Sequence, residues 1–323
     1  MTPKERAIAA LTLKTPDMVP TFELEFQLDE EMFGEKLITG EYSAGNLAKL
    51  SSKEKEEMIY KLAERWFKVY SSLEYSIFPC SYLGDFDSCG PGDIPNETKL
   101  FIKYLRQITG DNYMIHFHGD GTFSIPDGDE MYEFAYAIAD DPDGVRQQAL
   151  KMAENAIERN KRAAEAGIDC LILCSDYCYN SGPFLSPEMF GVYIQPYLKK
   201  IIDEARKDGL YTIKHTDGNI MPILNQLVEC KPHALHSLDP MARVDIKEVK
   251  RLVGDKVCLC GNVNCALMQT GTDEEVIESA EYCLTHAKPG GGYIFCTSNV
   301  PFKGLPAERY RLILDVWKRM RAY

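Results

Sequence analysis

The chain has 323 residues, 45% hydrophobic and 26% charged, which is typical of a globular protein with a sizeable core. Its 36 basic and 49 acidic residues give a formal charge of −13, which argues against nucleic acid as a partner because phosphate binding needs a basic face. The apolar runs are too short to span a membrane and the N-terminal sequence MTPKERAIAA is unlike a signal peptide, so we expect a cytoplasmic protein without membrane association.

Eight short runs rich in β-branched or aromatic residues are predicted strands, and helical stretches separate them. The predicted strands comprise residues 18–25, 74–81, 112–117, 169–175, 211–215, 234–238, 256–261 and 292–298. Helices are expected over residues 52–70, 142–167, 186–209 and 272–290. The third of these helices has Ser186 as its N-cap and Pro187 at its first position.

Eight strands alternating with helices predict an α/β protein with a single (β/α)₈ TIM barrel. No linker divides the chain, so residues 1–323 are expected to form one domain. A doubly wound sheet is the rival fold, but it needs a glycine-rich turn after the first strand, and TFELEFQLDEEMFG has none. The PGGGY segment precedes a strand and therefore does not bind a dinucleotide.

In such barrels the active site lies at the carboxyl ends of the strands, where the polar residues that end each run should converge. Those residues are Glu23, Glu25, Cys80, His116, His118, Asp176, His215, Asp217, Asp239, Asn262, Asn264, Cys296 and Ser298. The set contains carboxylates, imidazoles and thiols and lacks a cation. This composition indicates a metal site or a site for a neutral substrate.

The segment IKHTDGN places His215 and Asp217 two residues apart, so that both side chains share one face of a strand. Cys296 stands at the matching position of the last strand. One imidazole, one carboxylate and one thiolate suit zinc, with a fourth position open for substrate. The alternative is that Asp217 caps the following helix and His215 is a hydrogen-bonded core residue.

Several segments resemble the uroporphyrinogen decarboxylase superfamily, whose members are (β/α)₈ barrels. They are SDYCYNSGPFLSPEMFGVYIQPYLKKII, IKHTDGNIMPIL, LHSLDPMARVDIKEVKRLVGDKVCLCGNV and AKPGGGYIFCTSN. The N-terminal TPKERAIAALTLKTPDMVPTF resembles the opening helix and first strand of that superfamily, which implies an N-terminal helical extension.

Two activities occur within that superfamily. The decarboxylases carry an arginine-bearing segment after the first strand, whereas this chain has no arginine between Arg6 and Arg65. An acidic segment there should repel a porphyrin that bears many carboxylates. The other branch, cobalamin-dependent methyltransferases, has a zinc motif of histidine, one residue, cysteine and a distant second cysteine. His215 matches the first ligand and Cys296 the last, while Asp217 replaces the middle cysteine.

A carboxylate in that position makes zinc harder and favours an oxygen ligand. The resemblance therefore implies a zinc-dependent methyltransferase that moves methyl from a small O-methyl donor, such as a methoxylated aromatic compound, to the Co(I) corrinoid (cobalamin) of a partner protein. One alternative is methyl transfer from a methylcorrinoid to a thiol, as in coenzyme M methylation, or to a pterin. The sequence also leaves open a decarboxylase of a smaller acid and a binding barrel without enzymatic activity.

The remaining strand-end residues receive provisional roles. Asp176, Glu23 and His116 are the candidate catalytic groups, and Glu25 competes with Glu23 as a proton donor or further metal ligand. The candidate substrate-binding residues are His118, Tyr177, Tyr179, Asn262 and Ser298. A loop cap is the alternative for Asp176, a solvated strand end for Glu23 and a structural histidine for His116. We interpret His233, His236 and His286 as structural.

Overall fold

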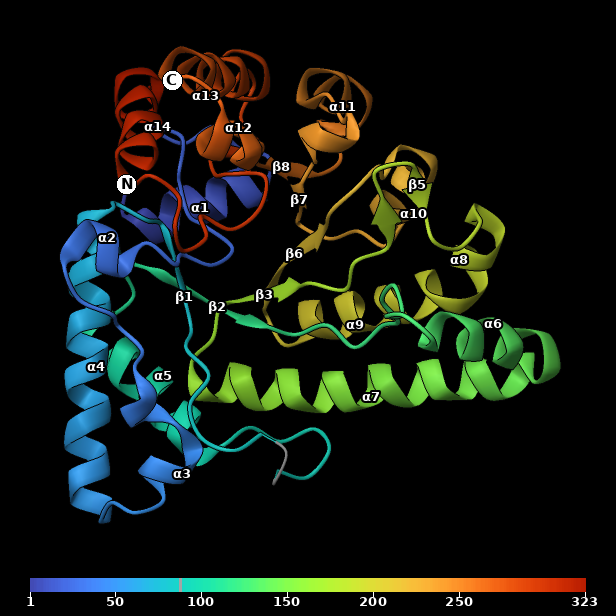
Figure 1. The fold of residues 1–323 in the computed structure, drawn as a ribbon, viewed down its shortest axis with the longest axis horizontal. Helices are drawn as coiled ribbons and strands as arrows, with labels where there is room; N and C mark the ends of the chain where they lie inside the picture. The colour runs from blue at the N-terminus through green and yellow to red at the C-terminus, as the bar shows by residue number, and fades with distance from the viewer. Residues whose placement is uncertain (87–88) are drawn as a thin grey trace.

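The computed structural model describes residues 1–86 and 89–323. Its main feature is a curled sheet of seven strands, in which every neighbouring pair is parallel (Figure 1). In spatial order the strands are β1 (Ile77–Pro79), β2 (Met114–His118), β3 (Cys170–Leu173), β6 (Tyr211–Thr216), β7 (Ala234–Ser237), β8 (Cys258–Cys260) and β9 (Tyr293–Ile294). Parallel strands in chain order, with helices between them, are the arrangement of a (β/α) barrel.

The segment predicted as the first strand, residues 18–25, lies between the two edges of this sheet. The Phe295 N–H donates to the Pro20 carbonyl at 2.9 Å, and the Ser76 N–H donates to the Thr21 carbonyl at 2.7 Å. This segment therefore takes the place of the eighth strand, although Pro20 has no N–H with which to continue a ladder. The predicted fold class, a TIM-like α/β barrel, is confirmed.

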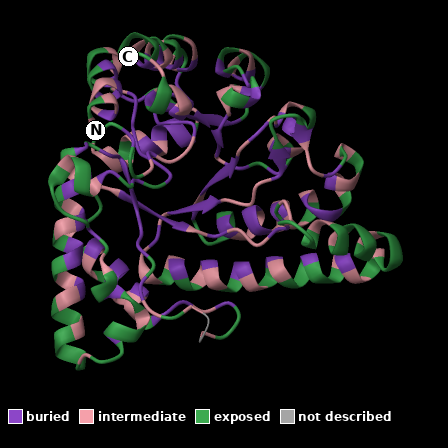
Figure 2. Cartoon of the chain, in the orientation of Figure 1, coloured by how far each residue is buried: buried purple, intermediate pink, exposed green. Residues whose placement is uncertain are grey.

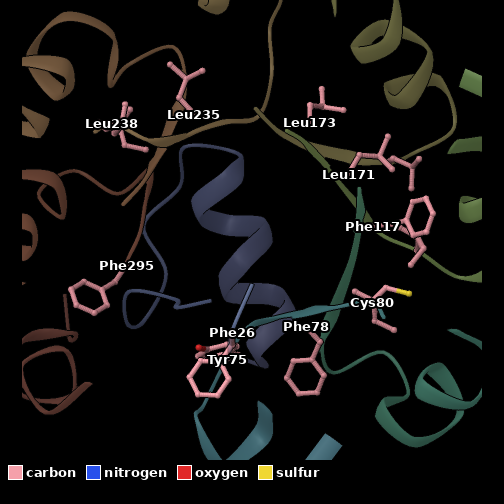
Figure 3. Packing of buried hydrophobic residues seen from close by; sticks show 14 of the residues in the cluster. Phe26, Tyr75, Phe78, Cys80, Phe117, Leu171, Leu173, Leu235, Leu238 and Phe295 are labelled. Carbon is pink, nitrogen blue, oxygen red and sulfur yellow. The ribbon is translucent and has the colours of Figure 1, made fainter. Parts of the chain in front are cut away.

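The strands are buried on both faces, as Figure 2 shows for the centre of the molecule. Figure 3 shows Phe117, Leu171 and Leu235 pointing away from the ring of strands, with α1 (Pro3–Leu11) seen inside it. Side chains of α1 pack with the inward-facing strand residues in a separate buried cluster that includes Phe22 and Cys296. The predicted N-terminal helix thus packs against the interior of the barrel.

Helices cover the outside of the sheet, and several begin at polar caps. The Ser51 hydroxyl accepts from the Glu54 N–H at the start of α4 (Ser52–Ser72), and Thr272 caps α13 (Asp273–Ala287) in the same way. The long helix α7 (Pro142–Ala166) begins with Asp141 as its cap. Because the polar caps are encoded locally, the starts of these helices were predictable.

The helix predicted over residues 186–209 is in fact two helices, α8 (Pro187–Tyr193) and α9 (Gln195–Lys207). The break falls at Ile194, two residues before Pro196. A proline inside a continuous helix lacks its N–H and its ring clashes with the preceding turn, so the chain restarts there. Pro196 therefore explains the error in this prediction.

The other helices complete the outer layer or decorate the loops. They are α2 (Asp29–Phe33), α3 (Ala44–Leu47), α5 (Asn96–Thr109), α6 (Glu130–Asp140), α10 (Leu224–Glu229), α11 (Ile246–Val253), α12 (Cys265–Thr270) and α14 (Ala307–Met320). A short antiparallel pair, β4 (Cys178–Tyr179) and β5 (Gly182–Pro183), follows β3. Within the described ranges, none of the helices has the length and apolar character needed to cross a membrane. All eleven cysteines are free, and nine of them are buried.

Candidate functional site

Three side chains with metal-binding groups meet at the carboxyl ends of β3 and β6. Asp176 follows β3, His215 lies in β6, and Asp217 follows β6, and one potential ligand atom from each lies within 4.8 Å of the other two. The His215 Nε2 is 3.7 Å from Asp176 Oδ1 and 3.8 Å from Asp217 Oδ1. We call these residues the triad. Their position agrees with the expected location of a barrel active site.

The His215 imidazole is buried and its pKa is lowered to about 3, first by loss of hydration and then by the charge of Lys214. The ring is therefore neutral at neutral pH. Its Nδ1 lies 2.8 Å from Nδ1 of His236, so this nitrogen takes part in a hydrogen bond within the protein. The other nitrogen, Nε2, faces the two carboxylates of the triad.

Two neutral donors hold the Asp217 carboxylate. The Ser237 hydroxyl donates to Oδ1 at 2.6 Å, and the Asn299 amide donates to Oδ2. Burial raises the pKa of Asp217 to about 6, and the negative charge of Asp176 acts in the same direction. Within residues 1–86 and 89–323, neither carboxylate of the triad forms an ion pair with a lysine or arginine. A divalent cation would relieve this repulsion, and one neutral imidazole with two carboxylates is a donor set that suits zinc.

The structure does not place Cys296 with the triad. Its side chain is fully buried in the cluster inside the barrel, and burial raises the pKa of its thiol well above the usual value. Asp176, which we predicted as a catalytic residue facing substrate, is grouped with His215 and Asp217 instead. The role of Cys296 as a zinc ligand stays a prediction, and the geometry favours Asp176 as the third ligand.

Glu23 is a buried carboxyl group that is linked to the triad through hydrogen bonds. The Tyr310 hydroxyl donates to its Oε1 at 3.2 Å, and Thr297 contacts it through its backbone N–H and its hydroxyl. The same Thr297 hydroxyl lies 2.6 Å from the carbonyl of Asn299, whose amide holds Asp217. Burial raises the pKa of Glu23 to about 8, so this group is mostly protonated at neutral pH.

A protonated Glu23 accounts for both contacts of the Thr297 hydroxyl. That hydroxyl has one hydrogen, so it donates to the Asn299 carbonyl while it accepts from the Glu23 carboxyl group. The solvated strand end considered as the alternative for Glu23 is excluded, because its side chain is 1% exposed. Its role as a catalytic proton donor stays a prediction.

The two histidines of β2 lie in different surroundings. His116 is completely buried, and both of its ring nitrogens lack a hydrogen-bond partner among the described residues. His118 lies at the end of β2 and lines a cavity of about 290 Å³ together with Tyr82, Phe86, Asp120, Arg159, Cys174 and Ser175. The catalytic role of His116 is untested, whereas His118 is positioned to contact a small ligand.

The other candidate substrate-binding residues lie in four different settings. Tyr177 is buried with its hydroxyl 2.6 Å from that of Thr122, and Tyr179 is half-exposed on β4. The Asn262 amide donates to the Leu238 carbonyl at 2.6 Å. Ser298 is buried, and its N–H donates to the Val263 carbonyl at 2.8 Å. Contact of these four residues with substrate therefore remains a prediction.

Sequence reasoning missed a buried ion pair beside the triad. The Lys214 Nζ lies 2.9 Å from Asp120 Oδ2 and 2.8 Å from the Ser175 carbonyl, and it stands 4.0 Å from the centre of the Tyr177 ring. Burial opposes ionisation of Asp120, but the charge of Lys214 and the hydrogen bonds from Lys214, Ser175 and Thr122 together outweigh it and hold the pKa at about 2. The pair fixes the start of the loop that carries Asp176.

His236, which we predicted to be structural, contacts the imidazole of the triad. The two segments KHTD and LHSLD carry a histidine near the end of adjacent strands, and the register pairs His215 with His236. This repetition was the available signal. The pairing brings the Nδ1 atoms of the two rings to 2.8 Å, so that His236 is hydrogen-bonded to the imidazole of the triad.

Comparison with known proteins agrees with the fold. Residues 127–319, more than half of the chain, match the family described as Uroporphyrinogen decarboxylase (URO-D). The uroporphyrinogen decarboxylase of Vibrio vulnificus (strain YJ016) is 24% identical over 268 residues, which cover 76% of this chain and 72% of that protein. The same enzyme of Pseudoalteromonas translucida is 25% identical over 208 residues, covering 59% of this chain and 54% of that protein.

Among solved structures, a methyltransferase from Methanosarcina mazei superposes with a TM-score of 0.70 and 17% sequence identity, covering 99% of both chains. At this identity the likeness shows a shared fold. Polar groups gather at the carboxyl ends of the barrel strands, where enzymes with this fold have their active sites. The chain belongs to the uroporphyrinogen decarboxylase family, which confirms the resemblance found in the sequence.

Proposed function

We propose that this protein is a zinc-dependent methyltransferase that moves a methyl group from a small O-methyl donor to the Co(I) corrinoid of a partner protein. The observation that carries the proposal is the triad of Asp176, His215 and Asp217 at the carboxyl ends of the strands. The likeness in fold to a methyltransferase is consistent with this activity. We further propose that the protein works in the reducing cytoplasm, because Co(I) is readily oxidised.

The triad residues are the proposed zinc ligands. When bound there, zinc would act as a Lewis acid toward the ether oxygen, whose negative charge grows as the methyl group leaves. His215 presents Nε2 because its Nδ1 is bonded to His236. Ser237 and Asn299 fix the orientation of Asp217. The carboxylate-rich set suits an oxygen ligand better than a thiol, which favours an ether donor over thiol methylation.

Asp176 and Asp217 are the partly exposed members of the triad, with 45% and 32% of their side chains accessible. The corrinoid would reach the methyl group from that open side. Glu23 holds a proton near neutral pH and is connected to Asp217 through Thr297 and Asn299. We assign it the role of stabilising the arrangement around Asp217, while the proton that the leaving oxygen takes up comes from water at the open side of the triad.

The relatives are named as uroporphyrinogen decarboxylases. This chain lacks the positive charge that would bind a highly anionic substrate. No arginine occurs between Arg6 and Arg65, and the end of the predicted first strand and the segment after it contain Glu25, Asp29, Glu30 and Glu31. These carboxylates would repel a polycarboxylate. This charge distribution favours methyl transfer over porphyrin decarboxylation.

The experiment that tests the proposal mixes the zinc-loaded protein with cob(I)alamin and a methoxyarene without oxygen. We expect methylcobalamin in the absorbance spectrum, an equal amount of phenol, and loss of both with His215→Ala. Transfer from methylcobalamin to an added thiol, without reaction of the ether, would contradict the proposed direction. Release of carbon dioxide from an added carboxylic acid, without any methylcobalamin, would instead identify a decarboxylase.

A further inference from the structure

We propose that the methyl donor is an aromatic ether that carries a carboxylate, and that it binds in the cavity lined by His118 and Arg159. This inference rests on the proposed function and names its substrate class. The cavity is bordered by Tyr82, Phe86, His118, Asp120, Arg159, Cys174 and Ser175, and we call it the Arg159 cavity.

The Arg159 cavity adjoins the triad. Cys174 and Ser175 follow β3 and line the cavity, and the next residue along the chain is Asp176. His118 ends β2, and the strand register aligns it with Ile172 of β3 and Ile213 of β6, two residues before His215. A ligand in the cavity can therefore place one end toward the triad while its other end stays between Tyr82 and α7.

The size and walls of the Arg159 cavity suit a single aromatic ring. Its volume of about 290 Å³ is near the small end of known ligand pockets, which span roughly 300–1,000 Å³. The Tyr82 ring centre lies 5.3 Å from that of Phe86 and 5.7 Å from that of His118. Aromatic rings at such distances offer edge and face contacts to a further ring.

Arg159 gives this cavity a positive charge. Its Nη2 donates to the main-chain carbonyl of Asp120 at 2.7 Å. In the part of the chain that the structure describes, it has no carboxylate partner. The nearby carboxylate of Asp120 is already occupied by Lys214, by the Ser175 N–H and by Thr122.

Among the described residues, the partly buried guanidinium of Arg159 has no carboxylate partner, which is unexpected in a chain with a formal charge of −13. Loss of hydration lowers the pKa of Arg159, which means that the charged form lacks the water it would have at the surface. A ligand carboxylate would replace that water and accept two parallel hydrogen bonds from the planar guanidinium. Because Asp120 and Asp176 lie close by, a ligand with one negative charge fits better than a polyanion.

The test compares two probes that differ only in charge, para-methoxybenzoate and para-methoxybenzamide. Their affinities are measured by calorimetry for the zinc-loaded wild type, Arg159→Met and Arg159→Lys. The matched control is Arg162→Met, since Arg162 lies one turn along the same helix and its Nε donates to the Gly92 carbonyl at 3.0 Å. Arg162 does not line the cavity.

We expect the wild type to prefer the benzoate, and Arg159→Met to weaken benzoate binding roughly 10- to 100-fold, as for loss of a charged hydrogen bond. Binding of the benzamide should be unchanged, which also shows that the variant is folded. Arg159→Lys keeps the charge but loses the two parallel N–H donors of the guanidinium, so its affinity for the benzoate should be intermediate. Arg162→Met should bind both probes like wild type. Equal binding of both probes by the wild type, no binding of either, or equal weakening of both by Arg159→Met would overturn the inference.

The binding measurement needs no corrinoid, so it separates this inference from the proposed function. If a neutral methoxyarene yields methylcobalamin and the benzoate shows no dependence on Arg159, the inference fails and methyl transfer stands. If the benzoate binds through Arg159 but yields no methylcobalamin with cob(I)alamin, the ligand class stands and methyl transfer is overturned.

Discussion

The Nδ1 atoms of His215 and His236 lie 2.8 Å apart, in a direct hydrogen bond between neighbouring strands β6 and β7. Both rings are buried, and burial lowers the pKa of each, so both are neutral near pH 7. One ring must donate and the other accept. If His215 is to offer a lone pair at Nε2, it carries its proton on Nδ1 and His236 accepts, which places the His236 proton on Nε2.

Replacing His236 by alanine should weaken zinc binding about 10- to 100-fold, because ligand histidines lose affinity when the partner of their second nitrogen is removed. Asparagine at this position offers an oxygen near the place of Nδ1, so His236→Asn should recover much of the affinity. The measurement is competition for zinc against a coloured chelator.

The control for this prediction is His286→Ala. His286 lies on α13 against Tyr282, on the outer layer of the barrel. If His236→Ala and His286→Ala have the same zinc affinity as wild type, His236 does not orient the ligand. If His236→Asn binds zinc as weakly as His236→Ala, although both variants unfold like wild type, the loss of zinc affinity does not come from the missing hydrogen-bond acceptor.

Glu23 should make stability fall with rising pH. Its pKa is about 8 in the folded protein against 4.5 in the unfolded chain, so above about pH 4.5 only the unfolded state gains from ionisation. The loss continues up to about pH 8 and amounts to roughly 2–4 kcal/mol between pH 5 and 8. Urea unfolding of wild type and Glu23→Gln at both pH values measures it.

The Glu23→Gln variant keeps the shape of the side chain but cannot ionise. Between pH 5 and 8 its free energy of unfolding should therefore fall by roughly 2–4 kcal/mol less than that of the wild type. Parallel pH profiles for the two proteins would show that Glu23 is ionised in the folded state. In that case, its role as a proton donor would also be excluded.

The Lys214–Asp120 pair should be strongly coupled. Lys214→Met leaves the carboxylate of Asp120 buried without its counter-ion and should cost about 3–5 kcal/mol of unfolding free energy. Adding Asp120→Asn removes that unpaired charge, so the double variant should be more stable than the sum of the single changes predicts. Denaturant unfolding of the four proteins gives the coupling energy.

An exposed pair serves as the reference for this cycle. Lys61 and Glu57 lie one turn apart on α4, 2.8 Å from each other and open to solvent. Lys61→Met should leave stability unchanged, since such pairs are screened by water. Additive effects at Lys214 and Asp120 would contradict the assignment of a buried, mutually dependent pair.

The alternation of strands and helices was readable from the sequence because both depend on local pattern and caps. The segments around β2, β3, β6 and β7 fall within or beside the predicted runs. Residues 18–25 form isolated bridges in place of a regular strand, since Pro20 interrupts the ladder. The break at Ile194 was missed because the apolar pattern continues through it while Pro196 does not permit one helix.

The candidate site was predicted in part. His215 and Asp217 came from their spacing within one strand, which needs no knowledge of tertiary structure. The position of Cys296 depends on the register of three further strand pairs. Across β6, β7, β8 and β9, that register aligns His215 with His236, Cys260 and Ile294. Cys296 therefore lies two residues beyond the position that aligns with His215.

The residues that support the site were not predicted because they reach it through contacts between positions far apart in the sequence. Lys214 and Asp120 are 94 positions apart, and Asn299 meets Asp217 across 82 positions. Neither contact leaves a local signature in a single sequence. Arg159 is one of many charged residues on a long helix, and only the cavity beside it distinguishes it.

The measurement that tests the central claim most directly is the metal content of protein purified without oxygen. We predict about one zinc per chain in the wild type. It should be lost in His215→Ala and reduced in Asp176→Asn and Asp217→Asn, while Cys296→Ala, with its thiol buried away from the triad, should retain it. A wild type that neither contains zinc nor takes it up would contradict the account, as would zinc that remains bound after His215 is removed.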